Sequence, residues 1–337
     1  MERIAKDGTV RRRTLCDQIA ATTARGLAFG AGPIGNAHHS LSDADAVATV
    51  HAAIARGMTY LDTAPLYGTG HSERRIGLAL RDVPRGEVVL STKVGRRLDP
   101  SRPAFGQDAA VRFDYGRDGA YRSLEESLSR LGVDRVDIAL IHDIDRWTHG
   151  DRQPDVFREA LDGAYRALVE LRDQGTVAAI GIGLNDSDVA LAAIEAMDLD
   201  IVLLAGRYTL LDQGAAERFL PAAAVRGVPV VVGGPFNSGI LATGARPGAL
   251  YNYAPAPPPV LDRVSRISAV CARHGVALPA AALQFPLRHP AVSAVVTGFA
   301  APDEVAVAIE RMSAIVPEDL WEELATEGLV NEGPGNG

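Results

Sequence analysis

Three ionisable residues and one amide follow short apolar runs of the sequence. Asp62 ends the run MTYLD, Lys93 ends EVVLSTK, His142 ends VDIALIH, and Asn185 lies just beyond VAAIGIG. A charge at the end of a buried strand is unfavourable unless it is paired or used in chemistry. An ion pair between Asp62 and Lys93 would satisfy both charges. Tyr67 lies on the segment that follows Asp62, so its phenol can reach the same cluster.

This combination of side chains predicts an acid–base centre. A phenol releases its proton near pH 10 in water and is a poor base at neutrality, but a neighbouring ammonium lowers the pKa. Lysine supplies a compact charge with a tunable pKa, which arginine does not. Lys93 is one of two lysines among 34 basic residues, so its retention fits this role. We expect Tyr67 to exchange a proton, Lys93 and Asp62 to tune it, and His142 to orient a substrate oxygen.

Each residue also has an ordinary structural interpretation. Asp62 can cap a turn, Lys93 can extend its amine to solvent, and His142 can be a hydrogen-bonded core histidine. Their joint placement at successive run ends favours a site over three separate coincidences.

The segments between these residues indicate how they are positioned. Eight short runs are apolar at nearly every position, as in parallel strands that are buried on both faces; they are 27–30, 58–62, 87–93, 136–142, 177–183, 200–205, 228–232 and 292–297. Amphipathic segments alternate with them. The pattern predicts an α/β protein with a (β/α)8 barrel, and a doubly wound open sheet is the alternative. In such barrels the active site lies at the carboxyl ends of the strands.

Local signals mark several helix ends. Ser42, followed by Asp45, is typical of a helix N-cap. Glycines follow four helical stretches, as left-handed C-caps require; they are Gly57, Gly132, Gly175 and Gly227. We expect residues 1–25 to form a mobile basic lead-in, residues 26–328 to form the barrel, and residues 329–337 to form a loose tail.

The composition limits the classes of molecule that the chain is expected to bind. The 337 residues carry a net charge of −8, which disfavours broad contact with nucleic acid or an anionic membrane. No apolar run is long enough to span a bilayer, and the amino terminus lacks the apolar region of a signal peptide. Two cysteines, Cys16 and Cys271, cannot form a disulfide framework and fit a reducing, cytoplasmic location. The expected partners are small molecules, with the chain a monomer or weak homo-oligomer.

Three other motifs are discounted. Gly30, Gly32 and Gly35 spell the G-x-G-x-x-G pattern of dinucleotide-binding loops, but the residues after them do not open a helix at once. The adjacent pair His38–His39 lacks a third ligand, so no metal is expected. Arg96–Arg97 is expected to be a solvated basic pair.

The segments DTAPLYGTGHSERRIGLAL (62–80), STKVG (91–95), SLEESLSRLGVDRVDIALIHDID (123–145) and IGIGLN (180–185) resemble the aldo-keto reductases. The resemblance runs from about residue 26 to about residue 320. Within that superfamily, GAGPIGN (30–36), LLAGRYTLLDQ (203–213) and YNYAPAP (251–257) resemble the L-fucose or D-threo-aldose 1-dehydrogenase and pyridoxal 4-dehydrogenase group.

The resemblance implies a (β/α)8 barrel that binds an extended nicotinamide cofactor. It makes Tyr67 the acid–base, with Lys93, Asp62 and His142 as its partners, and Asn185 the ligand of the nicotinamide carboxamide. The loop 233–241 matches the pyrophosphate-binding segment, with contacts at Gly234, Pro235, Phe236, Ser238, Gly239 and Leu241. The segment that surrounds the adenosine ribose supplies Gly298, Ala301 and Glu304.

Departures from the family pattern bear on the cofactor. Gly233, Ala205 and Leu184 stand where the family often has an aromatic residue, a glutamine and a serine, so the nicotinamide contacts are expected to be rearranged. Where users of NADP carry a basic residue and a hydroxyl, this chain has Ala300 and Ala301, followed by acidic residues. A 2′-phosphate would meet repulsion there. NAD is therefore expected to be preferred, with NADP possible.

The activity that the resemblance implies is the NAD-dependent oxidation of an aldose, of the L-fucose or D-threo type, at C1 to its lactone. The alternatives are a pyridoxal 4-dehydrogenase, a general aldehyde or ketone reductase, and a cofactor-binding regulatory subunit that senses redox state. Three long loops, 95–119, 143–154 and 233–259, are expected to set specificity, with Trp147 as a candidate aromatic face for the sugar and the polar run 143–152 suited to hydroxyl groups.

Overall fold

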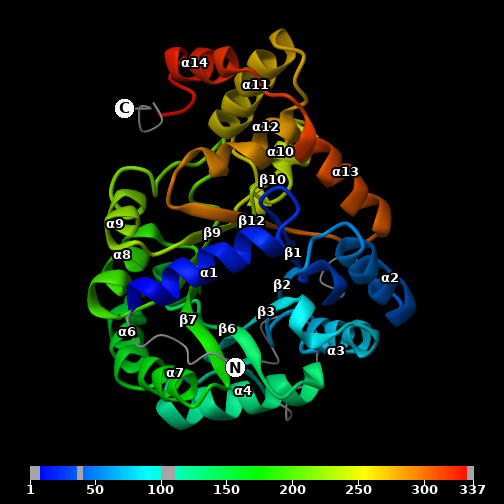
Figure 1. Ribbon diagram of the computed structural model, residues 1–337. Coiled ribbons are helices and arrows are strands. Elements are labelled where there is room, and N and C mark those ends of the chain that lie inside the picture. Colours follow the sequence, from blue (N-terminus) through cyan, green and yellow to red (C-terminus); the bar gives the residue numbers. More distant parts are fainter. Residues whose placement is uncertain (1–7, 36–40, 100–110, 332–337) are drawn as a thin grey trace.

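The computed structural model describes residues 8–35, 41–99 and 111–331. Eight parallel strands form a closed barrel in the order β1-β12-β9-β8-β7-β6-β3-β2 (Figure 1). Their bounds are β1 Leu27–Gly30, β2 Tyr60–Asp62, β3 Val89–Val94, β6 Val136–His142, β7 Val177–Leu184, β8 Ile201–Ala205, β9 Val230–Gly233 and β12 Val292–Gly298. Each predicted apolar run overlaps one of these strands, with ends that agree to within two residues. The prediction of a (β/α)8 barrel is confirmed, and closure of the sheet excludes the open-sheet alternative.

The strands are apolar throughout because both of their faces are buried. In β6, Ile138 and Leu140 belong to the apolar cluster inside the barrel. Ala139 and Ile141 point the other way and join the larger core between the strands and the surrounding helices. This double burial accounts for runs without the polar alternation of a half-exposed strand.

Helices surround the barrel (Figure 1). They are α2 Asp43–Ile54, α3 His71–Ala79, α4 Arg117–Leu131, α6 Gln153–Asp162, α7 Ala164–Asp173, α8 Ser187–Ala196, α9 Phe219–Arg226, α11 Pro258–Arg273, α12 Leu278–Gln284, α13 Pro302–Ser313 and α14 Glu318–Thr326. The cap prediction for α2 is confirmed, because Ser42 Oγ accepts the Asp45 N–H at 3.1 Å. All four predicted cap glycines have positive φ, between +62° and +81°. Among the described residues, no helix combines the length and apolar character needed to cross a bilayer.

The amino-terminal segment differs from the prediction. From Gly8 it forms the helix α1 (Gly8–Thr22), which lies across the amino-terminal end of the barrel (Figure 1). Leu15 and Ile19 are buried against the barrel interior, and the Arg11 guanidinium binds Asp198 at 2.8 Å and Asp200 at 3.1 Å. The expectation of a mobile lead-in is therefore wrong for residues 8–22, since apolar burial and ion pairs hold them. Residues 1–7 lie outside the described part.

The predicted tail also begins later than expected. Leu329 and Val330 are buried in the core, and the N–H of Leu329 donates to Leu324 O at 2.8 Å. The rest of that prediction, from residue 332, lies outside the described residues.

Three irregular segments rise at the carboxyl ends of the strands, where the long loops were expected. The first contains the paired strands β4 (Arg96–Leu98) and β5 (Val111–Phe113). The second carries the short helix α5 (Arg146–His149). The third contains the short helix α10 (Ile240–Thr243) and the hairpin of β10 (Leu250–Tyr251) and β11 (Ala254–Pro255). Together they surround the mouth of the barrel.

Candidate active site

The ends of β2 and β3 bring a carboxylate and an ammonium together. Lys93 Nζ donates to Asp62 Oδ2 at 2.8 Å and to Asp62 Oδ1 at 3.0 Å. The same nitrogen donates to Thr63 O at 2.8 Å, and Ser91 Oγ donates to Asp62 Oδ1 at 2.7 Å. Both residues are 2% exposed, so each charge compensates for the burial of the other.

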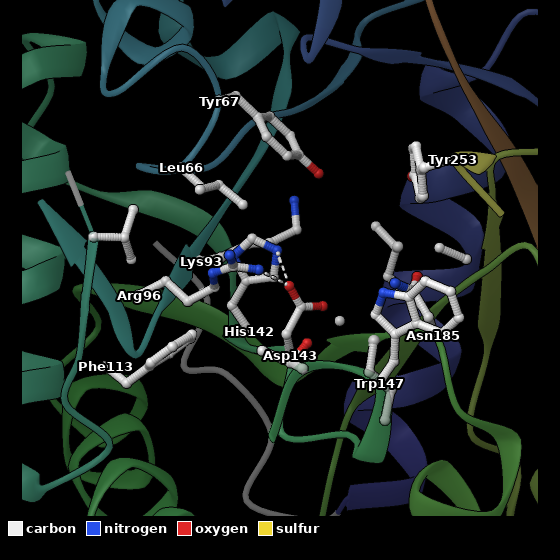
Figure 2. Close-up of a pocket in the computed structure, with 16 residues that line it drawn as sticks. Leu66, Tyr67, Lys93, Arg96, Phe113, His142, Asp143, Trp147, Asn185 and Tyr253 are labelled. Carbon is white, nitrogen blue, oxygen red and sulfur yellow. Dashed lines mark hydrogen bonds and ion pairs between the residues drawn. The ribbon is translucent and has the colours of Figure 1, made fainter. Parts of the chain in front are cut away.

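Tyr67 and His142 complete the cluster. Lys93 Nζ lies 4.7 Å from the centre of the Tyr67 ring, and the Tyr67 and His142 ring centres are 6.2 Å apart in an edge-to-face arrangement. Figure 2 shows these side chains around one cavity. The structure thus brings together all four residues to which the sequence assigned acid–base chemistry.

Glycines position the loop that carries Tyr67. A Cβ on Gly35 would lie 2.7 Å from the carbonyl carbon of Tyr67, and a Cβ on Gly68 would lie 1.6 Å from Gly35 O. Side chains at either position would therefore push the two loops apart. The discounted dinucleotide motif has a structural use here: Pro33–Gly35 forms a single 3-10 turn that packs on the Tyr67 loop.

Burial controls the protonation of the cluster. It raises the pKa of Tyr67 to about 12, although the Lys93 ammonium lowers it. The net shift is upward, opposite to the expectation from Lys93 alone, so the phenol keeps its proton at neutral pH. Burial disfavours the Lys93 ammonium, but Asp62 and Tyr67 outweigh it and raise the Lys93 pKa. Burial, with Arg96 and Lys93, holds the His142 pKa well below its usual value, so this imidazole is neutral.

A second ion pair, which the sequence analysis missed, adjoins His142. Arg96 is 8% exposed rather than solvated, and its Nη1 donates to Asp143 Oδ2. That oxygen lies 3.3 Å from His142 Nε2. Gly95, at φ +98°, turns the chain from β3 into β4; this glycine and the polar run after His142 are the only sequence signals of the pair.

The cavity beside these residues has a volume of about 530 Å³, in the range of small-molecule sites. Its polar lining includes Tyr67, Lys93, Arg96, His142, Asp143, Thr148 and Asn185, and its apolar lining includes Leu66, Phe113, Leu184, Leu203, Trp147 and Tyr253. Trp147 is 60% exposed and stands at the edge of the cavity, where the sequence placed a substrate contact. A small polar molecule with an apolar face fits such a site.

A second, smaller cavity of about 50 Å³ adjoins the first and shares Trp147, Asn185, Ala205 and Tyr253 with it. Gly234 and Ser238, two of the expected pyrophosphate contacts, line it. Gly234 has φ +60° and a Cβ there would find no atom nearer than Gly206 N at 3.8 Å, which leaves the loop open to a ligand.

Asn185 is held by its backbone. Its N–H donates to Asp145 Oδ2 at 3.2 Å, and its carbonyl accepts from Arg207 Nε at 2.8 Å. Its side chain lines both cavities, as an amide that binds a carboxamide requires. The residues between the catalytic cluster and the 234–238 loop therefore fit a nicotinamide cofactor.

The other expected cofactor residues lie at this edge of the barrel but differ in exposure. Pro235 is buried, Phe236 and Gly239 are partly buried, and Leu241 is fully buried in the core with its N–H bonded to Phe236 O. The side chain of Leu241 therefore has a packing role.

The residues expected to hold the adenosine end lie on the neighbouring strand and at the start of α13. Gly298 ends β12, which pairs with β9, and Ala301 is the N-cap of α13. Glu304 Oε2 accepts the Ala300 N–H at 2.7 Å, which places a carboxylate at this end. Neither described cavity includes these residues. No cluster of metal-ligating residues occurs within the described ranges, which exclude the His38–His39 pair.

Comparison with known proteins agrees with this architecture. The profile of the aldo/keto reductase family matches residues 26–325. The chain belongs to the aldo/keto reductase family. This aldo-keto reductase is 39% identical over 328 residues to a pyridoxal 4-dehydrogenase of Microbacterium luteolum, covering 92% of this chain and 95% of that one. It is 40% identical over 317 residues to a D-threo-aldose 1-dehydrogenase of a Pseudomonas species, covering 90% and 94%.

A solved structure extends the comparison of the fold. An aldo-keto reductase of Bacillus halodurans in its holo form superimposes with a TM-score of 0.72 at 24% identity, covering 92% of this aldo-keto reductase and 94% of that chain. The resemblance drawn from the sequence motifs is confirmed, and the protein is an oxidoreductase of this family.

Proposed function

We propose that this aldo-keto reductase oxidises the hemiacetal carbon of a sugar, C1 of an aldose, to the lactone with NAD. The observation that carries the proposal is the juxtaposition of Tyr67, Lys93, Asp62 and His142 beside a cavity with polar and aromatic walls. The 40% identity to an aldose 1-dehydrogenase supports the substrate class.

The residues act on the substrate hydroxyl as follows. A nicotinamide cofactor, when bound beside Asn185, would accept the hydride that leaves the carbinol carbon of the substrate. Tyr67 takes the hydroxyl proton as general base, and the Lys93 ammonium stabilises the phenolate that must form first. Asp62 keeps Lys93 charged and in place. The neutral His142 holds the substrate oxygen. In the reverse direction Tyr67 donates its proton to a carbonyl oxygen.

Pyridoxal is the second candidate substrate, because a pyridoxal 4-dehydrogenase shares 39% identity with this chain. The two candidates are chemically close. An aldose in water is mainly a cyclic hemiacetal, and pyridoxal closes in the same way between its aldehyde and the neighbouring hydroxymethyl group. Oxidation of either ring gives a lactone, so one arrangement of Tyr67 and His142 serves both. General aldehyde reduction uses the same residues in reverse.

The preference for NAD rests on the adenosine end. Asp303 and Glu304 lie in the first turn of α13, and the Glu304 carboxylate already accepts the Ala300 N–H. A 2′-phosphate at this turn would face two negative charges and lose a backbone donor. NADP remains a slower alternative cosubstrate.

The test is a substrate panel. L-Fucose, aldoses of the D-threo series, pyridoxal and simple aldehydes are assayed with NAD and with NADP, and cofactor binding is measured separately by fluorescence. We expect NADH formation with at least one sugar, lost in Tyr67→Phe and kept in Tyr165→Phe, whose hydroxyl accepts the N–H of Asp198 away from the cavity. Tight cofactor binding with no turnover of any compound would instead support a regulatory subunit.

A further inference from the structure

Asp143 has an unusual backbone conformation. Its φ is +49°, in the left-handed region that residues other than glycine seldom adopt, although aspartate tolerates it better than most. Three contacts hold it there. Its N–H donates to Gly183 O at 2.8 Å, and its carbonyl oxygen accepts the Tyr115 hydroxyl at 2.9 Å and lies 2.8 Å from His149 Nε2. A strained residue supported by this many bonds indicates a use for the conformation.

The consequence of this turn is the position of the carboxylate. It faces the imidazole of the preceding residue, with Oδ2 at 3.3 Å from His142 Nε2 (Figure 2). Arg96 Nη1 donates to the same oxygen, and the Arg96 guanidinium lies 5.4 Å from the centre of the Phe113 ring. The pair is thus fixed from two segments, the β4–β5 hairpin and the end of β6.

The contact discriminates between the two tautomers of His142. The ring is neutral, because burial and two nearby cations lower its pKa. His142 Nδ1 is buried and has no hydrogen-bond partner among the described residues. A proton on Nδ1 would leave a buried donor unsatisfied and point the Nε2 lone pair at a carboxylate. A proton on Nε2 instead faces the negatively charged Asp143 Oδ2 at 3.3 Å and is attracted to it, so this tautomer is favoured.

We propose that Asp143, held by Arg96, is a positioning residue that keeps His142 in the Nε2–H tautomer and so makes it a hydrogen-bond donor to the reacting oxygen. The proposal rests on the role assigned to His142 in the proposed function. The distance of 3.3 Å is longer than that of a committed charge-assisted bond, so the Nε2–H remains available to a substrate oxygen in the cavity.

The charges around Asp143 determine how its control of the His142 tautomer depends on pH. Burial raises the Asp143 pKa to about 6, and the Arg96 guanidinium opposes this shift. The charged groups that face Asp143 are Arg96, Lys93 and Asp145, and the neutral titratable groups are Tyr67, Tyr115, His142, His149 and Tyr253. Protonation of Asp143 below about pH 6 removes its negative charge and gives it an O–H that can donate to Nε2, so the preference for Nε2–H is lost.

The kinetic test uses Asp143→Asn, Arg96→Met and Arg96→Lys, with Arg97→Met as the matched control, since Arg97 pairs with Glu126 and Asp114 instead. kcat and KM are measured from pH 5 to 9 with the best substrate of the panel, together with the Kd for the cofactor. The wild-type kcat should fall as the pH drops below about 6, where Asp143 becomes protonated. This fall is the acid limb of the pH profile, and it is followed in each variant.

The variants should separate a positioning role from a structural one. Asp143→Asn should lose that acid limb and lower kcat about 10- to 100-fold, less than loss of the acid–base itself, with an unchanged cofactor Kd. Arg96→Met should move the limb upward by about 1 to 3 pH units. Arg96→Lys and Arg97→Met should resemble the wild type. An Asp143→Asn enzyme with wild-type kcat and pH profile, or an Arg96→Met enzyme whose limb does not move, would overturn the proposal.

A second readout does not depend on turnover. ¹⁵N NMR of the histidine-labelled protein reports which ring nitrogen carries the proton, and the spectrum of His142→Asn identifies the signals of that residue. We expect Nε2–H in the wild type and a mixture or Nδ1–H in Asp143→Asn. A wild-type Nδ1–H signal refutes the positioning role, whereas failure of the whole substrate panel with an Nε2–H signal refutes only the proposed function.

Discussion

The ammonium nitrogen of Lys93 lies 4.7 Å from the centre of the Tyr67 ring. A cation over the face of a phenol stabilises the phenolate more than the neutral ring, since its charge is attracted to the developing negative oxygen. Burial works in the opposite direction and outweighs the effect of the ammonium on the Tyr67 pKa. Tyr67 therefore keeps its proton at neutral pH, and its phenolate is stabilised by the Lys93 ammonium when it forms.

Removal of the phenolic hydroxyl should abolish turnover while the fold persists. Tyr67→Phe keeps the ring and its contacts but has no proton to exchange, so we expect kcat to fall about 100- to 10,000-fold. The cofactor Kd and the melting temperature should change little. Steady-state kinetics and fluorescence titration provide the check, and wild-type kcat in this variant would contradict the assignment.

The two directions of the reaction should differ in their dependence on pH. With the Tyr67 pKa raised to about 12, the phenol stays protonated between pH 7 and 9. Carbonyl reduction, which uses the protonated form, should be nearly constant over this range, whereas oxidation, which needs the phenolate, should rise with pH. Lys93→Met removes the ammonium that lowers the Tyr67 pKa, so it should depress oxidation more than reduction. Parallel profiles in the two directions would argue against Tyr67 as the titrating group.

Much of this architecture could be predicted because it depends on local patterns. The barrel strands are buried on both faces, so their runs are apolar throughout, and the acid–base residues lie at the strand ends where such barrels collect them. Helix α1 escaped prediction because its sequence is rich in arginine and has little apolar character; it is ordered by Asp198 and Asp200, more than 180 residues away. The Arg96–Asp143 pair escaped because it depends on two positive-φ turns that join separate loops.

The residues proposed to contact the adenosine end of the cofactor should decide between NAD and NADP. Glu304→Gln removes one negative charge from the first turn of α13, so kcat/KM with NADP should rise about fivefold or more relative to that with NAD. Glu310→Gln, on the exposed side of the same helix, serves as the control and should leave the ratio unchanged. A wild-type enzyme that uses NADP as well as NAD would refute the preference itself.

The packing of α1 should contribute measurably to stability. Ile19 is fully buried against the barrel interior, so Ile19→Ala should lower the free energy of unfolding by about 2–5 kcal/mol. Val10, on the same helix, is 49% exposed, and Val10→Ala should cost about 0.5 kcal/mol or less. Urea unfolding measures both, and equal midpoints for the two variants would mean that α1 does not support the barrel.

Helix α1 also closes the amino-terminal end of the barrel. The family profile matches from residue 26 onward, yet a chain trimmed to that point would expose apolar residues at the amino-terminal end of the barrel. It would also leave Asp198 without Arg11 and Arg12. The contacts that bury this end of the barrel therefore come from outside the segment that the family profile matches. Because this helix lies on the side away from the substrate entrance, a surface or fusion partner tethered through it would hold the enzyme with its mouth facing solution.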